Sequence, residues 1–204
     1  MTERRNRLTT AFRIILAIPH LILVGGPLGA ALSWSASQPG EDGSASAGGG
    51  GGGLIGLAAT VAAVISWFAI VFTGKQPEGL RGFCEFYIRW RVRAVAYTTL
   101  LRDEYPPFGE GDYPAEFEVD LPTLPRNRLT VGFRLLLAIP HILAVWFLGI
   151  GWFFTSIAAW FAILFTGNYP RGIYDYGVGV LRWNSRLEGY LLLLYDDYPP
   201  FFLR

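Results

Sequence analysis

Three long stretches without a charged residue dominate the hydrophobic pattern of the chain. The first two run from Ile14 to Leu32 and from Leu54 to Thr73, and each is close to the ~20 residues that a helix needs to cross a bilayer. The third, Leu135 to Thr166, is too long for one crossing and contains Gly149-Ile150-Gly151, which we interpret as a tight turn between two helices. The pattern therefore predicts four transmembrane helices, paired into two helical hairpins.

Each predicted hairpin is followed by a segment that mixes charged and aromatic residues. These segments, 77–102 and 170–195, begin at a proline and end before a Tyr-Pro-Pro motif, as helices commonly do. They are too charged to cross a bilayer, but arginine and aromatic side chains suit its headgroup layer. We therefore expect an all-α polytopic membrane protein with four transmembrane helices in two tandem hairpins, each followed by a cytoplasmic interfacial amphipathic helix.

The chain is an internal duplication. Residues 5–20 and 126–141 are identical at 12 of 16 positions, and a Trp-Phe-Ala-Ile motif that begins at Trp67 returns at Trp160. The separation falls from 121 to 93 residues between these two motif pairs, so the first copy has 28 additional residues. They include the Gly/Ser-rich segment 33–53, which we interpret as a flexible loop. The predicted domains are repeat one at 1–108, an acidic, proline-containing linker at 109–125, and repeat two at 126–204.

Composition and charge indicate a membrane protein. The mean hydropathy is +0.35, and 52% of the residues are hydrophobic against 16% charged. Arginines precede the first predicted span, lie between the second and third, and follow the fourth, whereas the segment 33–53 has none. By the positive-inside rule both termini are cytoplasmic, and the two copies enter the membrane in the same sense, related by an axis along the membrane normal.

The apolar segments have two rival interpretations. A cleavable signal peptide over residues 1–36 is disfavoured because the same pattern returns at 126–141, where no cleavage is expected. A hairpin that dips into one leaflet without crossing stays open. The use of arginine almost throughout, with Lys75 as the single lysine, is typical of a GC-rich bacterial genome, and we expect the protein in the bacterial plasma (inner) membrane.

A Pro-His pair places an ionisable group inside one predicted span of each repeat. His20 and His141 lie seven residues beyond Arg13 and Arg134, roughly 10 Å deeper at ~1.5 Å per residue. Intramembrane ionisable groups are often functional, and two facing imidazoles would line a path or bind a shared substrate. The structural alternative is that each imidazole hydrogen-bonds to a backbone carbonyl and fixes helix packing. No intramembrane carboxylate accompanies either histidine, which favours this alternative.

Repeated arginines form a second candidate site, for lipid or anion binding. Guanidinium groups at a cytoplasmic interface can bind lipid phosphates in bidentate geometry. Two structural alternatives are anchoring by positive charge and pairing with the acidic ends Asp103-Glu104 and Asp196-Asp197. The candidates are Arg13, Arg89, Arg93, Arg134, Arg182 and Arg186.

The sequence does not indicate a metal site, a cofactor, catalysis or nucleic-acid binding. A single cysteine, Cys84, leaves no cysteine cluster for a metal, and we predict neither a metal site nor a cofactor. No nucleophile with an acid–base partner can be proposed from spacing, so an enzyme is not expected. The net charge of +1 disfavours nucleic-acid binding.

The doubled motifs R-N-R-L…A-I-P-H, W-F-A-I-x-F-T-G and Y-P-P-F resemble the DUF4389 family of bacterial membrane proteins. The resemblance covers nearly the whole chain apart from the Gly-rich loop and the linker, and it supplies no catalytic residues. We expect a non-enzymatic accessory or scaffold protein that binds membrane lipids, through anionic headgroups, or other envelope proteins. The alternative is a small transporter or channel whose path is lined by His20 and His141.

Overall fold

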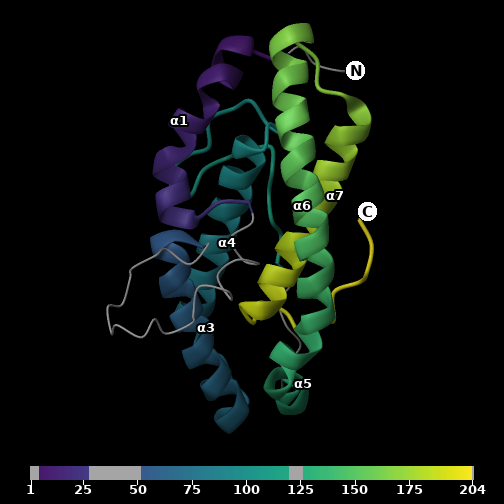
Figure 1. Cartoon of the computed structure of the whole chain (residues 1–204). Helices are drawn as coiled ribbons and strands as arrows, with labels where there is room; N and C mark the ends of the chain where they lie inside the picture. Colours follow the sequence, from purple (N-terminus) through teal and green to yellow (C-terminus); the bar gives the residue numbers. More distant parts are fainter. Residues whose placement is uncertain (1–4, 28–51, 120–125, 204) are drawn as a thin grey trace, which may run out of the picture.

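The described part of the chain is built from helices. The computed structural model describes residues 5–27, 52–119 and 126–203, and no strand occurs within these ranges. The all-α prediction is therefore confirmed there. In chain order the helices are α1 (Arg7–Val24), α3 (Gly53–Thr73), α4 (Glu78–Thr98), α5 (Arg128–Gly132), α6 (Arg134–Thr166) and α7 (Arg171–Leu191) (Figure 1).

α6 is a single uninterrupted helix of 33 residues. The predicted turn at Gly149-Ile150-Gly151 is wrong, because these residues lie inside α6. A glycine in a helix interior costs only about 1 kcal/mol relative to alanine, whereas a turn would leave helix-end N–H and C=O groups unpaired on an apolar surface. Among the described helices, α1, α3 and α6 are long and apolar enough to cross a membrane, which makes three candidates and not the four predicted.

α1 and α3 together correspond to α5 and α6 of repeat two, and the junction between α1 and α3 falls inside α6. Val24 ends α1 and Gly53 begins α3, and the repeat alignment places them opposite Val145 and Trp146, two consecutive residues of α6. A Cβ atom on Gly53 would lie 2.6 Å from the carbonyl carbon of Leu23, so the two helix ends abut. The 28 additional residues are thus inserted into the middle of a helix. The predicted loop 33–53 lies outside the described residues except for its last two positions.

The two repeats pack in opposite directions. α1 and α3 form one long column that descends beside α6, which ascends (Figure 1). Trp67 Nε1 donates to the carbonyl oxygen of Val131 at 2.9 Å, and its counterpart Trp160 donates to the carbonyl oxygen of Thr10 at 3.1 Å. The two columns are therefore antiparallel, while the predicted orientation of the two copies relative to a membrane stays a prediction. Each repeat contributes one column and not an even number of spans, so the pseudo-two-fold axis runs across the columns.

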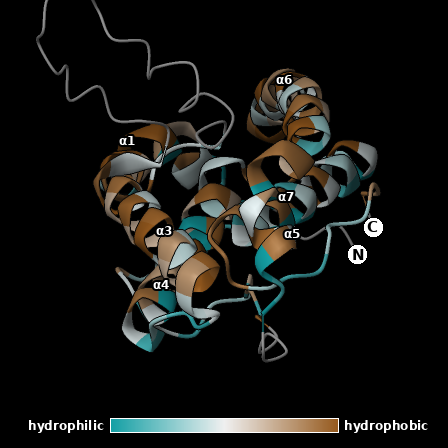
Figure 2. Cartoon of the chain, turned by 90° about the horizontal axis from the view of Figure 1, so that it is seen from below, coloured by the Kyte–Doolittle hydropathy of each residue, from teal (hydrophilic) through white to brown (hydrophobic). Residues whose placement is uncertain are grey.

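α4 and α7 form the interior of the molecule. They lie within the segments 77–102 and 170–195, which confirms the two predicted helices. Each helix begins directly after the proline that starts its segment. α4 packs on α1 and α3, α7 packs on α6, and α4 and α7 contact each other. In Figure 2 the ribbons of α1, α3 and α6 are coloured mostly as hydrophobic, while hydrophilic residues occur on the connecting segments and on parts of α4 and α7.

Candidate functional site

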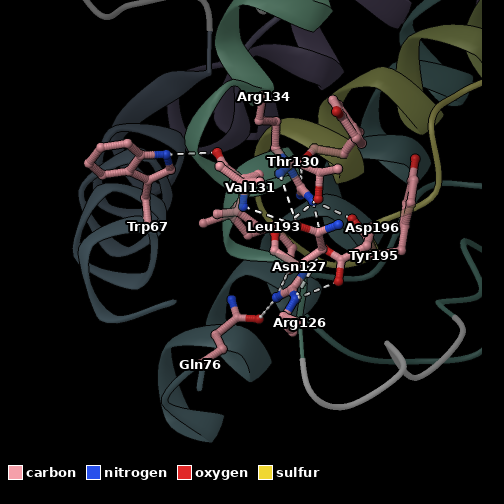
Figure 3. Close-up of polar contacts among 12 residues, drawn as sticks. Trp67, Gln76, Arg126, Asn127, Thr130, Val131, Arg134, Leu193, Tyr195 and Asp196 are labelled. Carbon is pink, nitrogen blue, oxygen red and sulfur yellow. Dashed lines mark hydrogen bonds and ion pairs between the residues drawn. The ribbon is translucent and has the colours of Figure 1, made fainter. Parts of the chain in front are cut away.

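Two arginines converge on one carboxylate at the start of repeat two (Figure 3). Arg126 binds both oxygens of Asp196 through Nε and Nη2, and its Nη1 donates to the carbonyl oxygen of Leu193 at 2.8 Å. Arg134 Nη2 donates to the same carboxylate at 2.6 Å. Burial by itself would raise the pKa of Asp196, but the hydrogen bonds and charges of Arg126 and Arg134 outweigh it and hold the pKa below its ordinary value.

Repeat one builds the same cluster from equivalent residues. Arg13 Nη2 lies 2.6 Å from Asp103, and Arg5 Nη1 lies 3.4 Å from it. Arg13 also donates to the carbonyl oxygens of Tyr97 and Arg102, and its guanidinium lies 4.7 Å from the centre of the Tyr97 ring. Each cluster joins the start of a column to the end of the interior helix that follows it in the chain.

The R-N-R-L motif supplies both a helix cap and one arginine of each cluster. Asn6 and Asn127 cap α1 and α5 by accepting hydrogen bonds from the backbone N–H groups of the second and third residues that follow each of them. Each cap places the preceding arginine, Arg5 or Arg126, next to a carboxylate. The motif is thus a helix start combined with an ion pair.

The terminal guanidinium nitrogens of Arg13 and Arg134 donate hydrogen bonds to other groups of the protein. Each residue is 1% exposed. The alternative of pairing with the acidic ends is confirmed for Arg13 with Asp103 and for Arg134 with Asp196. Lipid binding by these two residues stays a prediction, and the geometry offers them a structural role.

The four remaining arginines of the predicted set differ from one another. Arg89 is half-exposed and pairs with Glu85 one helical turn earlier. Arg93 is buried and donates to the carbonyl oxygen of Gly109 at 3.3 Å. Arg182 is exposed, while Arg186 lies over the Phe202 ring and donates to the Phe202 carbonyl oxygen. The equal spacing in the two repeats therefore does not produce equal environments.

Each histidine is enclosed by aromatic residues of its own repeat. His20 Nδ1 accepts a hydrogen bond from Trp90 Nε1 at 3.0 Å, and the imidazole stacks on Phe108 with ring centres 4.4 Å apart. His141 repeats this arrangement with Trp183 at 3.1 Å and Phe201 at 3.8 Å. In both bonds the acceptor is a nitrogen of histidine and the donor is an indole, a pairing that the sequence analysis did not predict. No contact joins the two imidazoles within the described ranges, and each belongs to a separate aromatic cage.

A buried ion pair between the repeats was missed by the sequence analysis. Arg91 on α4 pairs with Glu188 on α7 at 2.9 Å, and Tyr87 donates to the same carboxylate. Arg91 also donates to the carbonyl oxygens of Val24, the last residue of α1, and Gly26, which lies just beyond the end of that helix. One feature of the sequence points to this pair: Arg91 is replaced by asparagine in repeat two. In that repeat the long helix α6 is continuous.

An apolar cavity of about 340 Å³ lies between α1 and α6. Its wall includes Ile14 from α1, residues Thr98 to Leu100 at the end of α4, and Phe153, Ile157 and Phe161 from α6. Several of these side chains are also exposed on the outside, including Ile14 at 64% and Phe153 at 51%. The cavity is therefore reached from the apolar outer face, and its wall suits a hydrocarbon group.

Comparison with protein-family models identifies the repeated unit. The model described as "Domain of unknown function (DUF4389)" matches residues 52–109 and 128–203, once in each repeat and together over more than half of the chain. The chain belongs to the DUF4389 family. Its two matches bear out two tandem DUF4389 copies, and the first begins where the mid-helix insertion ends. No curated protein and no solved structure matches the chain.

Proposed function

We propose that this DUF4389 protein is a non-enzymatic membrane protein that binds a lipid acyl chain in the cavity between α1 and α6. The cavity itself is the observation that supports this function. Its wall is mostly hydrocarbon and aromatic, and it lies between α1 and α6, two of the helices that are long and apolar enough to cross a membrane. Small-molecule sites are typically concave, apolar and of at least this size.

In this proposal the protein binds the acyl chain of the lipid and not its headgroup. Arg13 contributes to the cavity wall, but its Nη atoms already bind Asp103 and two backbone carbonyls. The half-exposed Arg89 and exposed Arg182 do not line the cavity. Location in a bacterial plasma membrane and contact with envelope proteins remain predictions of the sequence.

Native mass spectrometry of the full chain, extracted in detergent, tests the proposal by counting co-purified lipid. Ile157→Trp places a larger side chain in the cavity wall. Val64→Trp is the matched control, because Val64 is the repeat-one counterpart of Ile157, is similarly exposed, and does not line the cavity. We expect Ile157→Trp to retain at least fivefold less lipid than the wild type and Val64→Trp to retain the wild-type amount.

A third variant separates chain binding from headgroup binding. It replaces Arg89, Arg93, Arg182 and Arg186 with glutamine, and the acyl-chain proposal predicts wild-type lipid content for it. Loss of anionic lipid in this variant, with normal retention by Ile157→Trp, would transfer the function to the arginines. Equal lipid content in all the variants and the wild type would reject cavity binding.

A further inference from the structure

The exposed side chains divide the protein into two faces. On α1, α3 and α6 the exposed residues are apolar apart from Arg7 and three threonines, and they include Phe72 at 73% and Phe154 at 64% exposure. On the two interior helices the exposed residues are charged or glycine: Glu78, Gly79, Gly82 and Arg89 on α4, and Arg171, Gly172, Asp175 and Arg182 on α7. The exposed apolar side chains of the helices thus gather on α1, α3 and α6, and the exposed charged ones on α4 and α7.

The polar face extends along the columns and is not confined to their ends. α4 contacts both α1 and α3, so it lies across the junction in the middle of the first column, and Arg89 is exposed halfway along α4. A bilayer that encircled the columns would hold Arg89 and its equivalent Arg182 in hydrocarbon. Charged side chains at that depth are expensive unless they face the protein interior or water.

Irregular backbone also runs beside the columns. The segment 102–119 contacts α1 through Asp103 and Phe108 and then reaches Arg89 on α4 through the Phe117 carbonyl. Its exposed residues after Gly109 are Glu110, Gly111, Asp112, Pro114, Glu116 and Glu118. Lipid-exposed irregular backbone does not occur within the hydrocarbon of a membrane. This side of the molecule therefore requires water.

The columns are longer than a bilayer requires. α6 has 33 residues, or about 50 Å at 1.5 Å per residue, while the hydrocarbon core is about 30 Å thick. A helix that lies in the membrane plane has no such length limit, and an apolar face combined with a charged one is the pattern of interfacial helices.

We propose that the protein lies in one leaflet of a bilayer, with α1, α3 and α6 parallel to the membrane plane. The apolar faces of these three helices are embedded, while the outer faces of α4 and α7 and the segment 109–119 are in water. The occupant of the apolar face is thus a lipid leaflet. This inference goes beyond lipid binding in the cavity, because it concerns the surface of the whole molecule.

The proposal is tested by measuring whether two positions of the same molecule lie on the same side of the bilayer. The full chain carries Arg128→Cys and Arg171→Cys in a Cys84→Ala background, and it is reconstituted into vesicles of phosphatidylcholine and phosphatidylglycerol. Both positions are exposed, and they stand at opposite ends of the unbroken α6. An impermeant maleimide labels outer sites first, a second maleimide labels inner sites after permeabilisation, and intact mass spectrometry reads the combination. In the in-plane arrangement every molecule carries the same label twice.

A matched pair on the other column repeats the measurement with Arg7→Cys and Lys75→Cys, at the start of α1 and just beyond the end of α3. One label of each kind in most molecules would overturn the proposal, because it would show that a column crosses the bilayer. Protein that fails to float with the vesicles would also overturn it, and would indicate that a second copy covers the apolar face.

A fluorescent reporter then identifies the embedded face. Phe154→Cys on α6 and Asp175→Cys on α7 both replace an exposed residue. With a polarity-sensitive dye we expect a blue-shifted emission at position 154 and a water-like emission at position 175. The reverse result, or equal emission at the two positions, would overturn the assignment of the faces.

Discussion

The guanidinium of Arg91 lies 2.9 Å from the carboxylate of Glu188, and this buried pair connects α4 of repeat one to α7 of repeat two. Neither residue has a charged counterpart in the other repeat, where asparagine and valine occupy the equivalent positions. The pair therefore breaks the pseudo-symmetry at the place where the inserted residues interrupt the first column. Its other acceptors, the carbonyl oxygens of Val24 and Gly26, lie at that interruption.

Loss of Glu188 should be strongly destabilising. Glu188→Leu leaves the buried Arg91 charge without its carboxylate, and we expect the free energy of unfolding in detergent to fall by about 3–5 kcal/mol. Glu85→Leu is the control, because its half-exposed pair with Arg89 contributes about 0.5 kcal/mol. Denaturant titrations followed by circular dichroism measure both. Equal losses for the two variants would contradict the assigned role of the buried pair.

The inserted residues should be dispensable for folding. Deletion of residues 25–52 joins Val24 to Gly53, as Val145 is joined to Trp146 in α6. We expect the shortened chain to be as helical as the wild type, with a continuous first column. Circular dichroism and size-exclusion chromatography in detergent measure this. As a control, deletion of 28 residues from within α6 should abolish folding, and comparable damage by the two deletions would refute the equivalence of the columns.

Acid should weaken the arginine–carboxylate clusters. The folded-state pKa of Asp196 is lowered from 3.8, so its ionised form contributes stability above that value and loses it as the pH falls through the lower folded-state pKa. We expect the wild type to lose stability between about pH 5 and its acid transition. Asp196→Asn should be less stable at pH 7 and show a shallower dependence over the same range. Parallel pH profiles of the two proteins would contradict the linkage.

The histidines should act as hydrogen-bond acceptors for indoles. His20→Leu leaves the buried Trp90 N–H without an acceptor, and we expect a loss of about 1–3 kcal/mol in the free energy of unfolding. The double variant His20→Leu with Trp90→Phe should cost less than the sum of the two single variants, because both partners are removed together. Additive losses would show that the bond contributes nothing. The same cycle for His141 and Trp183 provides an internal repeat of the measurement.

Much of the local structure was predictable from short windows of sequence. The segments that hold α4 and α7 follow from proline at the start and a polar pattern with aromatic residues, and the duplication predicts each of these two helices from the other. The site was predictable only in part. Pairing of Arg13 with Asp103 was anticipated as an alternative, while the Arg91–Glu188 pair lies between positions 97 residues apart and has no local signature.

The sequence by itself determined that the protein is all helical, duplicated and apolar on long segments, since helix propensity, capping and repetition act over one or a few turns. Only the tertiary structure decided that Gly149-Ile150-Gly151 continues a helix and that the repeats run in opposite directions. These outcomes depend on contacts between distant residues, such as the bond from Trp67 to Val131 across 64 positions. Apolar composition is compatible with a hairpin or a single column, and packing against α4 and α7 selects between them.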